Sequence, residues 1–247
     1  MIKSRHGPPL TTEEIEEKIQ QQIPKATMNS AQWAKRTFNS WLVERNSRIL
    51  NMSESSELLF LSKDGHSTLS DLTKSTLNEA LKFFFFEVRK RNGDVYPSDT
   101  LRCLLTGLNY CLSNIEKKTW NLWTDEEFKE ARISLDAAMK KTSQEGHNPR
   151  RKRAGIISTE QENNLWERHY LGEDNPRKLN RNVLYLLSVH CGLRGGRELR
   201  DLRFGENAQI VLKKVDDVEF LEYTESYTKT YKHGLRSHHI EPKIVKV

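Results

Sequence analysis

Cysteine and zinc-binding motifs are scarce in this sequence of 247 residues. Its three cysteines are Cys103, Cys111 and Cys191. The first two fall on one predicted helix about 12 Å apart along its axis, which is too far for a disulfide. No cysteine pair and no cysteine–histidine pair has the spacing of zinc ligands. We therefore expect reduced core thiols in an intracellular protein, with no metal site and no other cofactor.

Long apolar runs are also missing. No run approaches the roughly 20 residues that span a bilayer, and the N-terminal stretch MIKSRHGPPLTTEEIEEKIQ has no apolar segment of the kind found in signal peptides. Membrane-embedded and secreted classes are thereby disfavoured. We expect a soluble protein of the cytosol or nucleus, without a membrane partner.

Charge, in contrast, is abundant and uneven. The chain has 40 lysines and arginines against 34 aspartates and glutamates, a net charge of +6. From residue 148 onward, 19 basic residues face 14 acidic ones, so +5 of this excess lies in the last two-fifths of the chain. A lopsided basic charge favours a polyanionic partner, nucleic acid first. The alternative is an ordinary soluble basic protein.

Apolar residues at helical spacing predict four helices between about residues 29 and 142, after an N-terminal extension, residues 1–26, with one peripheral helix capped by Thr11 or Thr12. The second of the four is expected to end at Asn92-Gly93, the third to be capped by Ser98, and the fourth to begin with a capping box of Thr124 and Glu127. The expected core residues are Trp33, Thr37, Phe38, Trp41, Leu42, Leu69, Leu72, Leu77, Leu81, Phe84, Phe85, Val88, Leu101, Leu104, Leu105, Leu108, Cys111 and Leu112.

Residues 143–157 lack periodicity and are interpreted as a basic linker between two domains. The basic run in this linker consists of Arg150, Arg151, Lys152 and Arg153. Such a run suits a solvated linker, a nuclear localisation signal or a strap along a phosphate backbone, and these three alternatives stay open. We count its four cations among the candidate DNA contacts.

Two helices and a small sheet are predicted over residues 158–247. The first helix has a capping box of Ser158 and Gln161, and the second begins near Pro176. Beyond about residue 208 the sequence alternates and is β-branched, which predicts three antiparallel strands with turns at Asp216-Asp217 and His233-Gly234. The second helix is expected to present an apolar face made of Val183, Leu184, Leu187 and Cys191.

The stretch CGLRGGRELRDLRFG, residues 191–205, carries an arginine at every third position. A helix, a glycine turn, Arg194 and a new helix N-terminus suit a phosphate, because the guanidinium binds two oxygens in a fork and helix N–H groups add donors. Gly195 and Gly196 leave room for close backbone approach. The alternative is that Arg194 pairs with a carboxylate such as Glu198 or Asp201.

A second cation, Lys229, is expected near the tip of the predicted β-hairpin. A lysine there can reach a DNA groove or protonate a leaving oxygen. The alternative is an ordinary exposed hairpin lysine.

These residues carry a resemblance to a known family. GLRGGRELRDLRFG, followed by a three-stranded sheet with TKT, resembles the first half of a tyrosine recombinase catalytic domain of the phage-integrase type. The upstream stretches WAKRTFNSWLVERN and ALKFFFFEVRKRNGDVYPSDTLRCLLTGLNYCL resemble Crypton-type tyrosine recombinases of eukaryotic transposons. They are also similar to the Crypton-derived domain of vertebrate MYM-type zinc-finger proteins and glutamine-rich relatives. The resemblance covers roughly residues 27–247.

The resemblance implies a mainly α fold with a small antiparallel sheet. A helical, SAM-like core-binding domain over residues 27–142 would clamp DNA, followed by part of a catalytic domain over 158–247. In this family a tyrosine attacks a phosphodiester, arginines hold the phosphate and a hairpin lysine is the general acid. By motif position, Arg194 matches the first catalytic arginine and Lys229 the hairpin lysine. Arg197 and Lys232, the latter a poorer match to the hairpin lysine, are candidate DNA contacts.

Departures from the family pattern limit what the resemblance implies. The family's second arginine box and its nucleophilic tyrosine are expected beyond Val247, and Arg197 stands where bacterial members commonly have an acidic residue. Tyr223, Tyr227 and Tyr231 fall in the hairpin rather than on the nucleophile's helix. We therefore expect a nuclear, double-stranded-DNA-binding protein of recombination and integration descent that, as given, does not cleave DNA and is not an active enzyme alone.

Two alternatives stay open. One is a domesticated chromatin- or transcription-associated module without recombinase chemistry, and the other is a helical protein-interaction domain that binds no DNA. Self-association on DNA also stays open.

Overall fold

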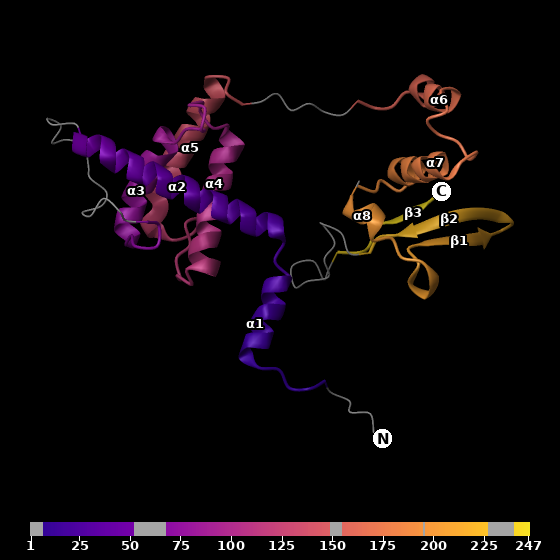
Figure 1. Ribbon diagram of the computed structural model, residues 1–247, viewed down its shortest axis with the longest axis horizontal. Coiled ribbons are helices and arrows are strands. Elements are labelled where there is room, and N and C mark those ends of the chain that lie inside the picture. The colour runs from indigo at the N-terminus through magenta and orange to yellow at the C-terminus, as the bar shows by residue number, and fades with distance from the viewer. Residues whose placement is uncertain (1–6, 52–67, 149–154, 195, 227–239) are drawn as a thin grey trace. The chain divides into compact units, whose positions relative to one another are not determined.

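The chain divides into two compact units, Met1–Lys152 and Arg153–Val247, with the division inside the segment interpreted as a linker. Over its described part the protein is mainly helical with a small three-stranded antiparallel sheet, which confirms this coarse fold class (Figure 1). The computed structural model describes residues 7–51, 68–148, 155–194, 196–226 and 240–247.

The first unit opens with the peripheral helix α1 (Thr12–Gln21), which buries none of its residues. Its cap is Thr11, whose side chain accepts the Glu14 N–H while its own N–H donates to the Glu14 carboxylate. A longer helix, α2 (Lys25–Asn51), follows. The predicted helix and its threonine cap are confirmed.

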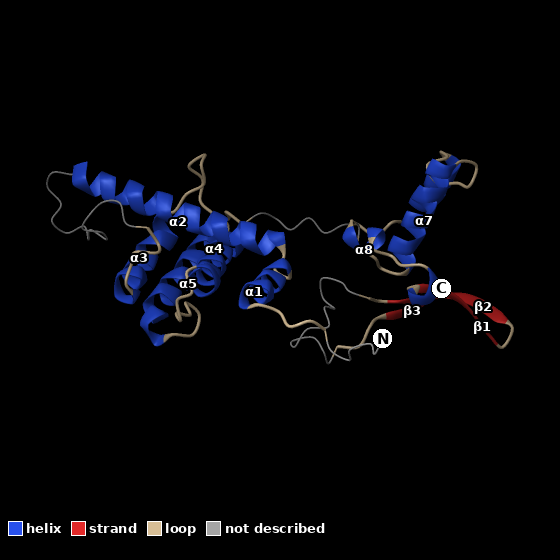
Figure 2. Cartoon of the chain, turned by 60° about the horizontal axis from the view of Figure 1, so that its bottom comes forward, coloured by secondary structure: helices blue, strands red, loops and turns tan. Residues whose placement is uncertain are grey.

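Helix α2 lies across α3 (Lys74–Glu87), α4 (Ser98–Tyr110) and α5 (Lys129–Gln144) in both views (Figures 1 and 2). An aromatic cluster joins α2 to α3, with the Phe84 ring centroid 5.2 Å from those of both Phe38 and Trp41. Most of the expected core residues are buried, as predicted. Trp33 and Thr37 are only half-buried, and Cys103 is exposed rather than a core thiol.

A close helix crossing joins α2 to α4. A Cβ added to Gly107 would stand 2.6 Å from the Ala34 Cβ and 3.1 Å from the Ser30 carbonyl oxygen, so only glycine fits there without a shift. One turn later α4 widens into the π-helical turn η1 (Cys111–Ile115), where the Cys111 thiol donates to the Ala31 carbonyl at 3.1 Å. These contacts fix which face of α2 stays outside the core.

Two predicted helix starts are wrong. Ser98 does not cap α4, because Pro97 precedes the helix and the Ser98 hydroxyl instead donates to the Met139 carbonyl of α5. Likewise, α5 is entered through the 3-10 turn η2 (Glu126–Phe128) with no side-chain cap, and the Glu127 carboxylate pairs with Lys74 at 3.1 Å. In both places a tertiary contact takes the group that a local cap would use.

The predicted end of the second helix is also wrong. Helix α3 ends at Glu87, and the chain then forms a tight antiparallel hairpin in which Arg89 bridges Val95. Asn92 and Gly93 lie in the turn of this hairpin, with Gly93 at φ +88. At the other end, Leu69 and Leu72 are buried in the turn before α3, and Thr73 caps the helix.

The second unit begins with α6 (Thr159–Glu167), whose capping box of Ser158 and Gln161 is confirmed. Helix α7 (Pro176–His190) starts with its proline in the first turn after an Asn175 cap, and the four-residue α8 (Arg197–Arg200) and the 3-10 turn η3 (Gly205–Asn207) follow. The sheet has the order β1-β2-β3 and comprises β1 (Ile210–Val215), β2 (Val218–Thr224) and β3 (Ile244–Lys246).

The turn between β1 and β2 is the predicted one. Asp216 and Asp217 have φ angles of 49° and 65°, as a two-residue hairpin turn of type I′ requires, and Val215 pairs with Val218 across it. The His233-Gly234 turn lies outside the described residues. The three predicted antiparallel strands are confirmed.

The core of this unit is small. Cys191, Leu193 and Tyr223 are buried, and Leu187 packs against them. The predicted apolar face of α7 is wrong in part, because Val183 is 44% exposed and Leu184 is 38% exposed. Only the C-terminal end of α7 meets the buried cluster of the described residues, so positions one turn earlier have nothing to pack against there.

Candidate nucleic-acid interface

The turn after α7 is built by a glycine and a lysine. The Cys191 N–H still bonds the Leu187 carbonyl at 3.0 Å, and Gly192 then reverses the chain with φ +61. The Lys243 amine, from the residue before β3, donates to the Cys191 carbonyl at 2.9 Å. A cation at a helix C-terminus satisfies a free carbonyl and complements the helix dipole. The φ of +61 at Gly192 favours glycine, and a Cβ there would stand 2.8 Å from that amine, so the lysine side chain would have to shift.

Arg194 leaves this turn into solvent. Its backbone N–H donates to the Glu198 carboxylate at 2.8 Å, and its side chain is exposed. Within the described residues its guanidinium forms no ion pair, so the pairing with Glu198 or Asp201 considered from sequence is not seen. The expected new helix is only the four residues of α8, which makes the guanidinium itself the group that can hold an anion.

Most other predicted site residues cannot be placed. Lys229, Lys232 and the basic run Arg150–Arg153 lie outside the described residues. Arg197 begins α8, but its side chain is not described. Among the predicted site residues, the structure therefore describes the side chain of Arg194 alone.

Lys243 was missed by sequence reasoning. It lies 52 residues after Cys191, and no local motif links the two. Only the pairing of β3 with β2 carries its amine to the end of α7. The backbone N–H of Lys243 also donates to the Glu225 carboxylate at 3.2 Å, and the Glu225 N–H returns a bond to the Lys243 carbonyl at 2.8 Å, which fixes this strand start.

Tyr223 belongs to the core of this unit. It is 3% exposed, and burial, with smaller contributions from the negative charges of Glu225 and Glu198, raises the pKa of its phenol to about 12. The phenol therefore stays protonated at neutral pH. Its place in the buried cluster with Cys191 and Leu193 gives Tyr223 a packing role in this unit. Tyr227 and Tyr231 lie outside the described residues.

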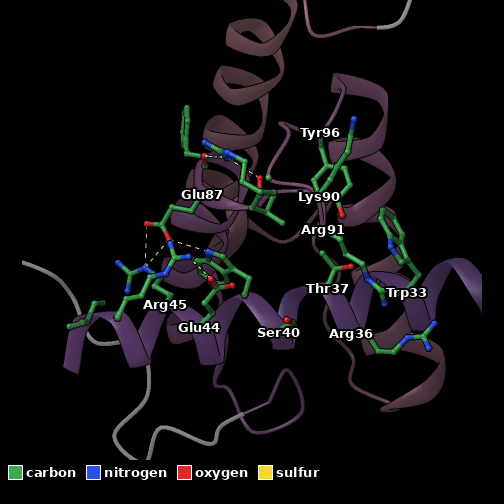
Figure 3. A pocket seen from close by; sticks show the side chains of 17 residues that line it. Trp33, Arg36, Thr37, Ser40, Glu44, Arg45, Glu87, Lys90, Arg91 and Tyr96 are labelled. Carbon is green, nitrogen blue, oxygen red and sulfur yellow. Dashed lines mark hydrogen bonds and ion pairs between the residues drawn. The ribbon is translucent and has the colours of Figure 1, made fainter. Parts of the chain in front are cut away.

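A basic groove, missed in the sequence, lies in the first unit between α2 and the hairpin over residues 88–96 (Figure 3). Its volume is about 1200 Å³. Helix α2 contributes Trp33, Arg36 and Thr37, and the hairpin contributes Lys90, Arg91 and Tyr96. The second of the four helices was predicted to continue to Asn92-Gly93, which hid the hairpin that forms one wall.

The two ends of the groove differ in charge. At one end the Glu87 carboxylate accepts bonds from the Trp41 indole and the Arg45 guanidinium, at 3.0 and 3.1 Å, and Arg48 pairs with Glu44. At the other end, drawn on the right of Figure 3, Arg36, Lys90 and Arg91 gather around Trp33 and Tyr96. None of these three cations has a carboxylate partner among the described residues.

Two family models match the chain. One, described as QRICH1 domain, matches residues 29–142, and the other, described as Domain of unknown function (DUF3504), matches residues 156–245. The chain is thus similar to glutamine-rich-protein and transposon-derived families. The first match spans α2 to α5 and the second runs from just before α6 into β3. No curated protein and no solved structure matches the chain.

Among the residues that the structure describes, no group of three or more histidine, cysteine, aspartate or glutamate side chains could hold a metal ion. None of the helices in this described part is long and apolar enough to cross a bilayer.

Proposed function

We propose that the chain is a nuclear, DNA-binding protein of tyrosine recombinase descent that holds duplex DNA with its C-terminal unit and basic linker and does not cleave it. The observation that carries this proposal is the exposed Arg194 guanidinium on a turn fixed by Gly192 and Lys243. The Glu198 carboxylate accepts the Arg194 backbone N–H, and the guanidinium has no ion pair within the described part, so the guanidinium suits a phosphate oxygen pair. The +5 excess of this region adds attraction for a polyanion.

The similarity to transposon-derived families supports the proposed descent. The DUF3504 model covers α6 through β3, the region that carries the GLR turn. A transposon-derived ancestry is consistent with a recombinase origin. The Crypton assignment, the SAM-like character of the helical unit and the roles of Arg194 and Lys229 remain parts of this proposal.

Loss of DNA binding on replacing Arg194 tests the proposal. Arg194→Ala should weaken duplex binding and lower the salt slope, d log K/d log[salt], by about 0.9, the value for one phosphate contact. The measurement is fluorescence anisotropy of a labelled duplex at several salt concentrations. Arg168, at the end of α6, is also exposed, and Arg168→Ala is the control that should change the slope less.

Unfolding in urea separates this role from a structural one. If Arg194→Ala unfolds the protein while the folded fraction keeps full affinity for duplex, Arg194 is structural and the proposed phosphate contact is wrong.

A suicide substrate tests the absence of cleavage. A nicked duplex that traps a covalent protein–DNA adduct should yield none with this chain, because the described hairpin tyrosine, Tyr223, is buried and protonated. An adduct that disappears when Tyr223, Tyr227 or Tyr231 is replaced by phenylalanine would show that a hairpin tyrosine attacks DNA and that this part of the proposal is wrong.

A second candidate function rests on exposed apolar side chains of the C-terminal unit. Helix α7 exposes Leu179, Val183 and Val189, and the sheet exposes Leu212 and Ile244. Apolar patches on a surface mark protein-interaction sites, and these exposed side chains are the candidates for one in this unit. Such a patch favours a chromatin- or transcription-associated interaction module, for which duplex affinity would be absent at any salt concentration.

A further inference from the structure

The cationic end of the groove in the N-terminal unit is built by two elements that are far apart in sequence. Arg36 lies one helical turn beyond Trp33 on α2, whereas Lys90, Arg91 and Tyr96 come from the hairpin. The hairpin is held by the Arg89–Val95 bridge and by the Lys90 N–H, which bonds the Asp94 carbonyl at 2.9 Å. Both walls are therefore fixed by backbone structure rather than by the charged side chains.

Aromatic rings line the same end. The Trp33 and Tyr96 rings meet edge to face, with centroids 6.0 Å apart and an interplanar angle of 74°. Burial raises the pKa of the Tyr96 phenol, and the positive charge of Arg91 partly offsets this rise. Cations and half-buried rings thus share one end of the groove (Figure 3).

The size of the groove bears on its ligand. Its volume of about 1200 Å³ exceeds the roughly 300–1,000 Å³ typical of small-molecule pockets. A segment of a polymer fits better than a metabolite. Three cations at one end, without a carboxylate partner in the part of the chain that the structure describes, favour an anionic polymer.

The combination of rings and cations selects the polymer. A charged groove that follows a phosphate backbone, with aromatic rings that stack on bases, is the usual arrangement for single strands. Duplex DNA keeps its base faces stacked internally, so recessed rings cannot reach them. An acidic peptide would use the arginines but would leave the rings without a role.

We propose that this groove binds single-stranded nucleic acid, with Arg36, Lys90 and Arg91 on phosphates and Trp33 and Tyr96 against bases. This site is in the other unit from the duplex contact of the proposed function and does not depend on it. The phosphates of the bound strand would lie at the cationic end of the groove. At the other end the charges of Glu87 and Glu44 are each neutralised by an ion pair with an arginine.

The charge part of the proposal is tested with the full chain and a labelled oligothymidine of about 12 nucleotides, within the range of single-strand sites. The double variant Arg36→Gln/Arg91→Gln should bind it more weakly and lower the salt slope by about 1.4, since each single-strand phosphate contact contributes about 0.7. Arg102→Gln, an exposed arginine of α4 outside the groove, is the matched control and should leave the slope nearly unchanged.

The stacking of bases on Trp33 is tested with the variant Trp33→Leu, which is compared on oligothymidine and on an abasic oligomer of the same length. Loss of one stacked base should weaken oligothymidine binding at least about fivefold, with abasic binding unchanged. Trp33 also packs against the core, so urea unfolding should first show that the variant is folded. Equal loss for both oligomers, or a poly-glutamate chain that competes as well as oligothymidine, would overturn the proposal in favour of a simple anion or acidic-peptide site.

A duplex of the same length separates this site from the C-terminal one. The groove variants should affect single-strand binding more than duplex binding, and Arg194→Ala should leave single-strand binding unchanged. Groove variants that weaken duplex and single strand equally would overturn the proposal in favour of a duplex contact. Failure of the Arg194 test alone leaves the groove result standing.

Discussion

Replacing Phe84 by alanine should lower the free energy of unfolding of the N-terminal unit by about 3–5 kcal/mol, the cost of emptying a large buried aromatic site. Phe84 has no exposed surface and lies against the rings of Phe38 and Trp41. Those rings belong to α2, which is pinned against α4 at Gly107, so the helices cannot close over the cavity without disturbing a second contact.

The same run of phenylalanines supplies the control. Phe86 is 41% exposed, two positions along α3, and Phe86→Ala should change the free energy of unfolding far less. Urea unfolding followed by circular dichroism measures both variants. If Phe86→Ala costs as much as Phe84→Ala, the face of α3 that meets α2 has been assigned wrongly.

Replacing Arg150, Arg151, Lys152 and Arg153 together by alanine should cause the largest loss of DNA binding. Each phosphate contact that is lost lowers the salt slope by about 0.9, so the loss reaches about 3.6 if all four cations contact phosphates. Affinity should fall most at low salt, where the counterion contribution is greatest. The measurement is a titration of labelled duplex at salt concentrations between about 50 and 200 mM.

A control set of three lysines elsewhere on the chain shows whether position or net charge matters. Lys129, Lys140 and Lys141 are exposed on α5, and each has a carboxylate partner. Replacing these three by alanine lowers the net charge but should change the slope little. If both sets of substitutions have the same effect, the chain attracts DNA through its overall charge and the linker is no special contact.

Periodicity predicts the helices well because burial follows it directly. Leu77, Leu81 and Phe84 recur at helical spacing, and all three are buried. Helix caps were predictable only where no residue distant in sequence binds the side chain that would form the cap. Ser158 keeps its box with Gln161, whereas Glu127 pairs with Lys74, 53 residues away in sequence. Such a contact leaves no local pattern, so the predicted box at Thr124 was wrong.

The candidate sites, too, were predictable from the sequence only where they depend on local residues. Arg194 was found because its glycine turn is local, but the amine that supports this turn comes from Lys243, which only the sheet brings near. The groove was missed because Val88 through Arg91 continue the pattern of α3, while the chain actually turns back so that Arg89 bridges Val95. A hairpin that follows a helix without a proline gives little warning in the sequence.

The salt dependence of duplex binding by the unaltered full chain tests the central claim most directly. Anisotropy of a labelled duplex of mixed sequence, titrated at rising salt, gives log K against log[salt]. We predict a straight line of negative slope, with similar affinity for an unrelated duplex, as phosphate contacts from Arg194 and the basic linker require. No binding at low salt, or an affinity that salt does not change, would contradict the claim that this chain is a DNA-binding protein.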